Sequence, residues 1–141
     1  MIDLNKDTLT IKEFLTTSIE SFRLINKAPN SIGIYCCSWS GWISINFNVN
    51  KKLTETKNNC PDFEYVEYDL LEMPEWGNEY QTDNPEFKIN NKIKIPNPDL
   101  GDEGFNKLIF DYLKPIVIEF KESHQSDFLL QMLDINLAEE I

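Results

Sequence analysis

Two segments in which apolar residues recur every three or four positions constrain the fold most strongly, because each predicts a long helix that must bury one face. The first runs from about Thr10 to Ile25 and the second from about Asp102 to Ser123. Thr10 and Glu13 have the spacing of a capping box, which predicts that the first helix begins there. Pro115 lies inside the second pattern, where it is expected to kink or split the helix.

The segments between and after these helices have strand patterns. An apolar, β-branched run at Ser31–Cys37 and an alternating run at Trp42–Val49 predict a hairpin with a four-residue turn between them. Further strands are expected at residues 66–71 and 128–137, with short edge pieces at 87–95. Because no regular β–α–β alternation is present, residues 1–141 are expected to form a single α+β domain, with a mainly antiparallel sheet and two long helices packed on one face.

Thirty consecutive residues, Asn58 to Phe87, contain nine carboxylates and no Lys, Arg or His, so this segment carries a charge of −9. Tyrosine, phenylalanine and tryptophan are interleaved with the acids, which is atypical of a disordered acidic tail. The segment is therefore expected to fold, with an acidic strand followed by a short helix that begins at Pro74. In that strand Val66, Tyr68 and Leu70 alternate with Glu67, Asp69 and Leu71, and the acidic face is expected to point outward.

This acidic segment has two interpretations. In one, the acids form a solvated face that keeps the protein soluble, while the aromatic residues fill the core. In the other, part of the segment binds a basic protein, since a concentrated charge attracts a partner of opposite sign. The residues predicted to contact such a partner are Glu67, Asp69, Glu72, Glu75, Trp76, Glu79 and Tyr80.

Trp39 and Trp42 flank the predicted hairpin turn and are a second candidate for contacts with a partner. A tryptophan at such a turn either anchors a partner or covers the end of the core, and the sequence favours neither.

Composition excludes several other partners. A net charge of −11 would repel nucleic acids and anionic membranes, and no Lys/Arg cluster offsets this repulsion. No apolar segment has the length of a signal peptide or a membrane span, and three cysteines do not form a secreted disulfide framework, so a cytoplasmic location is expected. Cys36, Cys37 and Cys60 are interpreted as thiols without chemistry.

Catalytic chemistry has little basis in this sequence. The single histidine, His124, is expected at a helix end, where it interacts with the helix dipole rather than acting as a catalytic base. No metal-binding motif, glycine-rich phosphate loop or cofactor motif is present, so no catalytic residue, metal or cofactor is predicted. A hydrolase that uses a pair of carboxylates is a third function hypothesis, and it is weaker than either of the two hypotheses in which the protein binds a partner.

Two segments, SIGIYCCSWSGWISINFNVN and LLEMPEWGNEY, resemble the bacterial domain-of-unknown-function family 4303. The similarity spans roughly Ser31 to Tyr80, and the matching positions are Gly41, Trp42, Phe47, Pro74, Glu75 and Trp76. It implies a place among the small immunity-type proteins of polymorphic toxin systems, without a defined reaction.

Together, these observations predict an intracellular immunity protein, not an enzyme, that binds and neutralises a basic bacterial toxin domain such as a nuclease. The alternative is an adaptor or regulatory domain that binds another partner through Trp39 and Trp42.

Overall fold

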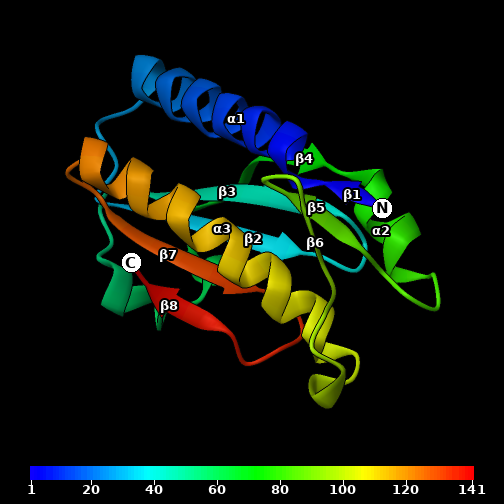
Figure 1. The fold of residues 1–141 in the computed structure, drawn as a ribbon. Coiled ribbons are helices and arrows are strands. Elements are labelled where there is room, and N and C mark those ends of the chain that lie inside the picture. Colours follow the sequence, from blue (N-terminus) through cyan, green and yellow to red (C-terminus); the bar gives the residue numbers. More distant parts are fainter.

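The computed structural model describes residues 1–141 and places two long helices over one face of a five-stranded sheet (Figure 1). The helices are α1 (Leu4–Ile25), α2 (Pro74–Tyr80) and α3 (Glu103–Ser123). The strands are β1 (Ile2–Asp3), β2 (Ser31–Cys37), β3 (Trp42–Asn48), β4 (Tyr65–Glu72), β5 (Phe87–Ile89), β6 (Lys92–Lys94), β7 (Asp127–Met132) and β8 (Ala138–Glu140). The predicted α+β fold is thus confirmed.

The large sheet has the order β4-β3-β2-β7-β8, and only the β2–β7 pair is parallel. A second, small sheet joins β1, β5 and β6. Here β5 pairs with β1 in parallel and with β6 in an antiparallel hairpin, so β5 is central rather than an edge piece. Asn90 and Asn91 form the hairpin turn with positive φ, which asparagine tolerates better than most residues.

Helix α1 begins six residues earlier than the spacing of Thr10 and Glu13 predicts. Asp3 is its N-cap, and its carboxylate accepts the N–H groups of Asn5 and Lys6 at 3.1 and 3.2 Å. Leu4 then adds a buried apolar residue to the first turn. The predicted capping box is wrong because an aspartate upstream satisfies the free N–H groups of a longer helix.

Helix α3 continues through Pro115 without a break, so the predicted split is wrong. The side of the helix that carries Pro115 is exposed to solvent, where water can satisfy the carbonyl group that proline leaves without an N–H partner. The buried face, which includes Phe105, Ile109, Leu113 and Val117, continues on both sides of the proline.

The main core lies between the two long helices and the sheet. Its centre is the pair Phe22 of α1 and Phe47 of β3, whose rings stack with 4.0 Å between their centroids. Ile43 and Ile45 continue the inward row of β3, as their alternation predicts.

The opposite face of the sheet is partly covered by residues 51–64, which form two short 3₁₀ turns. Leu53, Cys60 and Phe63 pack there with Leu129 of β7. Gly33 of β2 lies beneath this cover, and a Cβ atom at that position would be 2.8 Å from the sulfur of Cys60. These residues therefore form a second, smaller core with the sheet.

The strand predicted over 128–137 ends at Met132: its first part belongs to β7, residues 133–137 form a turn, and β8 follows as the second strand of a hairpin. The chain turns after Met132, and Asp134 has a φ of +62°. The apolar alternation continues through this turn, because Ile135 and Leu137 still pack against the main core.

Candidate protein-binding surface

Strand β4 forms one edge of the large sheet, with β3 on one side and no strand on the other. Its ladder pairs Glu72 with Trp42 and Leu70 with Ser44 of β3. On the free edge, the N–H of Leu70 donates to the carboxylate of Asp69 at 2.9 Å. A free edge presents main-chain donors and acceptors with which another extended chain can pair.

A bulge at Glu67 interrupts the pairing of β4 with β3. Glu67 has a φ of +50°, and the register shifts on either side of it. Two buried asparagines of β3 replace the missing ladder bonds: Asn46 accepts the N–H of Glu67 at 2.6 Å, and Asn48 accepts the N–H of Glu64 at 2.9 Å. The bulge ends the strict alternation of faces on which the sequence prediction rested.

As a result, Asp69 does not share an outward face with Glu67. It pairs in register with the inward-facing Ile45, and its carboxylate accepts the hydroxyl of Ser18 on α1 at 2.9 Å. Together with its bond to the N–H of Leu70, this contact occupies both carboxylate oxygens. Asp69, although exposed, thus forms a bond between α1 and the sheet, and its contact with a partner stays a prediction.

Two other acids of the segment also bind within the molecule. Glu64 accepts the N–H groups of Val49, Asn50 and Lys51 at 2.7–2.9 Å, and these bonds, the Lys51 bond foremost, lower the pKa of its carboxyl. Glu79 binds the N-terminal ammonium at 2.7 Å.

Burial of the Glu79 carboxyl opposes its ionisation, but the N-terminal ammonium and the N–H of Glu86 outweigh this effect and hold its pKa below the usual value. The predicted role of Glu79 at a partner is therefore corrected, since its carboxylate holds the N-terminus against α2.

Trp76 was predicted at the surface but lies in the core with none of its side chain exposed. Its indole N–H donates to the carboxylate of Asp7 at 2.8 Å, and its ring meets Tyr112 edge-on. Tyr80 is half-buried against Phe105, with 5.2 Å between ring centroids. The apolar face of α2 points inward because it closes the end of the main core, so the predicted contact of Trp76 with a partner is wrong, whereas that of the partly exposed Tyr80 stays a prediction.

Three predicted acids remain exposed and form no ion pair: Glu67, Glu72 and Glu75. The register of β3 and β4 places Trp42 beside Glu72, so the acidic segment and the tryptophan hairpin form one neighbourhood. We define the β4 surface as these three acids with Trp39, Trp42, Val66 and Leu70.

Of the apolar side chains on the β4 surface, Trp39 and Trp42 were predicted as contacts, whereas Val66 and Leu70 were not. Val66 is 51% exposed, Leu70 38% and Trp39 39%. Val66 and Leu70 were assigned to the inward face of an unbroken strand, and the sequence gives no signal for the bulge that changes their orientation. An apolar, aromatic-rich centre with a polar rim is the usual composition of a protein-binding patch.

The negative potential extends from α2 to the start of α1. Burial raises the pKa of the Asp7 carboxyl above its usual value, the bond from Trp76 partly offsets this, and the nearby carboxylates of Glu75 and Asp3 raise it further. Asp7 was not among the predicted site residues. Its proximity to Trp76 and Glu75 depends on the packing of α1 beside α2.

Other kinds of site have little support in the structure. No group of three His, Cys, Asp or Glu side chains is arranged to hold a metal ion. His124 is the C-cap of α3, as expected, and its Nδ1 is 2.8 Å from the carbonyl oxygen of Phe120. All three cysteines are free and buried. None of the helices combines the length and the apolar character needed to cross a membrane.

Comparisons of the chain with protein-family models, with curated proteins and with solved structures found no match. The resemblance to family 4303 stays a prediction from the sequence.

Proposed function

We propose that this protein is an immunity-type inhibitor, which binds a basic toxin domain through the β4 surface and has no enzymatic activity of its own. The observation that carries the proposal is the free edge of β4, where Glu67 and Glu72 stay exposed and unpaired beside Leu70 and Trp42. A basic active site such as that of a nuclease matches this charge.

The pattern of ion pairs supports binding over a role in solubility alone. Five cations, four lysines and the N-terminus, form ion pairs, none of which involves an acid of the β4 surface. Like charges that lie close together reduce stability, and a surface selected only for solubility tolerates interspersed lysines. A charged partner would offset this repulsion upon binding.

The first experiment identifies the partner. The tagged protein is used to capture proteins from its host at low salt, and the retained polypeptides are identified by mass spectrometry. A basic polypeptide that is encoded beside this gene, retained at near-stoichiometric yield and toxic when expressed alone supports the proposal. Failure to retain the product of such a neighbouring gene when it is expressed contradicts it.

The second experiment tests the surface. In the triple variant Glu67→Lys, Glu72→Lys and Glu75→Lys, association with the captured partner is expected to slow by at least about tenfold at low salt. The matched control replaces Glu13, Glu20 and Glu122, which are exposed acids on α1 and α3 without ion pairs and give the same change in net charge. An equal effect in the two variants refutes the assignment to the β4 surface.

The adaptor hypothesis places binding at the neighbouring tryptophans, of which Trp39 is 39% exposed. Apolar contacts are little affected by salt, whereas steering by exposed charges weakens as salt rises. Association that is insensitive to salt but lost in Trp39→Ala favours the adaptor hypothesis over the immunity proposal.

A further inference from the structure

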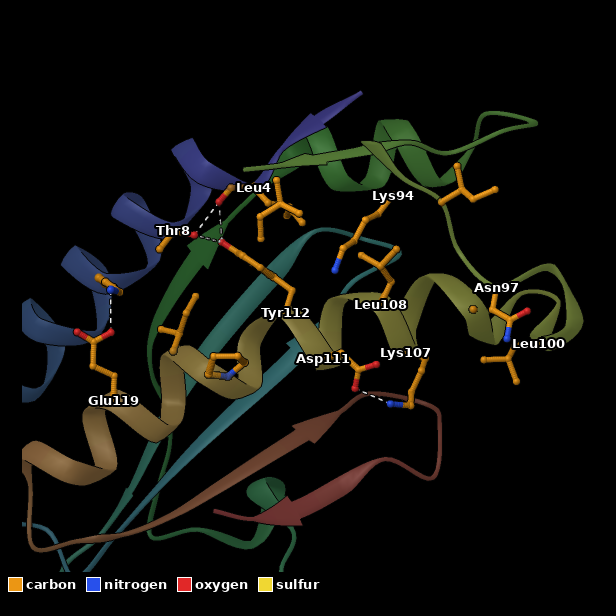
Figure 2. A pocket seen from close by; sticks show the side chains of 16 residues that line it. Leu4, Thr8, Lys94, Asn97, Leu100, Lys107, Leu108, Asp111, Tyr112 and Glu119 are labelled. Carbon is orange, nitrogen blue, oxygen red and sulfur yellow. Dashed lines mark hydrogen bonds and ion pairs between the residues drawn. The ribbon is translucent and has the colours of Figure 1, made fainter. Parts of the chain in front are cut away.

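A cavity of about 730 Å³ lies between α1 and α3 (Figure 2). The β5–β6 hairpin and the segment that leads from it to α3 form its outer wall. Its volume falls in the range of small-molecule sites. The salt bridge between Lys12 of α1 and Glu119 of α3, 2.7 Å long, spans one end, and residues 97–100 close the other. A groove bounded at both ends favours a small ligand over a peptide that runs through it.

The walls of this cavity are apolar and partly exposed. Ile95 is 64% exposed and Leu100 43%, and both face the cavity together with Leu108 and Pro115 of α3. Apolar side chains that line a concave surface gain stability when a ligand removes them from water. The ligand therefore has an apolar body.

The polar groups at the inner end are already satisfied within the protein. Thr8 donates its hydroxyl to the carbonyl oxygen of Leu4 at 2.7 Å, and the hydroxyl of Tyr112 lies 3.1 Å from the same oxygen and 2.9 Å from Thr8. These hydroxyls do not require further donors from a ligand.

One cation in the cavity has no partner. Of the three lysines that line it, Lys12 pairs with Glu119 and Lys107 with Asp111, whereas Lys94 forms no ion pair. Figure 2 shows Lys94 extending from β6 toward α3.

The segment that carries Lys94 is basic, although the whole chain carries a charge of −11, and the two acids that line the cavity, Asp111 and Glu119, are each paired with a lysine. Residues 87–98 include three lysines and no acid. A local positive potential of this kind attracts an anion to a site that the rest of the protein would repel.

From this combination we infer that the cavity binds a small amphipathic carboxylate, with its carboxylate at Lys94 and its alkyl body against Ile95, Leu100 and Leu108. The chemical class is a medium-chain alkyl carboxylate. This site is separate from the β4 surface and does not depend on the proposed inhibitor function.

The experiment titrates decanoate into the ¹⁵N-labelled protein and follows amide shifts by NMR. Saturable shifts are expected at residues 94–95 and 108–112, and decanol, which lacks the charge, is expected to bind about fivefold more weakly or worse.

Two pairs of variants test the contacts. Lys94→Gln is expected to weaken decanoate binding about fivefold, whereas Lys92→Gln, which changes the same charge on the same strand outside the cavity, leaves it unchanged. Ile95→Ser is expected to weaken binding by at least about fivefold, whereas Ile93→Ser does not. Ile93 and Ile95 are 62% and 64% exposed, so neither replacement removes a core residue. Absence of saturable shifts, or equal losses within either pair, overturns the inference.

Discussion

Replacement of Trp76 by phenylalanine is expected to lower the free energy of unfolding by about 3 kcal/mol. The indole ring is fully buried at the end of the main core, where α2 meets α1. Its N–H donates to the carboxylate of Asp7, 69 residues away in the chain. The variant therefore loses both packing volume and a hydrogen bond that joins two helices.

The magnitude has two parts. An indole exceeds a phenyl ring by about three heavy atoms, and at about 0.8 kcal/mol for each buried CH₂-sized group this loss amounts to about 2 kcal/mol. The hydrogen bond adds about 1 kcal/mol, a value reduced from that of a fully buried charged acceptor because Asp7 is only half-buried.

Urea denaturation followed by far-UV circular dichroism measures the change, with an unaltered m-value expected. A double-mutant cycle with Asp7→Ala is expected to give a coupling energy of about 1 kcal/mol between the two residues. A loss below about 1 kcal/mol in Trp76→Phe, or a coupling energy of zero, would refute the assignment of Trp76 to the core. Acrylamide quenching in a variant that retains only this tryptophan is expected to be weak.

Four further predictions follow from the hydrogen bonds, the backbone and the thiols. Because burial raises the pKa of Asp7, its ionisation reduces stability as pH rises above 3.8, so Asp7→Asn is expected to raise the free energy of unfolding at pH 7 and to have no effect at low pH. Glu64→Gln should show the opposite sign: because backbone N–H groups lower the folded pKa of this exposed carboxyl, a small loss of stability at pH 7, reduced by solvent screening, should disappear as the pH falls below 4.5 and through the folded pKa. Gly41→Ala is expected to lower the free energy of unfolding by about 3 kcal/mol or more, because Gly41 has a φ of +80° and the new Cβ would lie 2.1 Å from the carbonyl oxygen of Met73. Gly101→Ala should lower it by only about 1 kcal/mol, because Gly101 has a φ of +56° but open space around it. The three buried cysteines are expected to react with a thiol reagent only at the rate of unfolding, and rapid reaction in the folded protein would contradict their burial.

Most helices and strands could be predicted because their signals are local. The apolar spacing of Phe14, Leu15, Ile19 and Phe22 predicts α1, and the alternation of Ile43, Ile45 and Phe47 predicts β3. Errors occurred where a boundary depended on a group outside the pattern. Asp3 rather than Thr10 caps α1, and the turn after Met132 divides an apparently continuous strand.

The candidate surface was predicted only in part. Composition identified the acidic segment, but it did not distinguish carboxylates that bind within the protein from those that remain free. Glu79 meets the N-terminus and Asp69 meets Ser18, partners 78 and 51 residues away. The free acids Glu67 and Glu72 differ from them in no feature of the sequence.

The sequence by itself determined the fold class, the main elements and the concentration of charge, because side-chain periodicity and composition follow directly from the order of residues. Only the tertiary structure decided that Trp76 is buried, that Glu67 stays exposed and that Trp42 lies beside Glu72. The physical reason is that Trp76 is buried by the packing of α2 over the end of the main core, whereas the other two outcomes depend on strand register. The side chains of Asn46 and Asn48 hold the bulge in β4, and a shift of one residue reverses the faces of a strand.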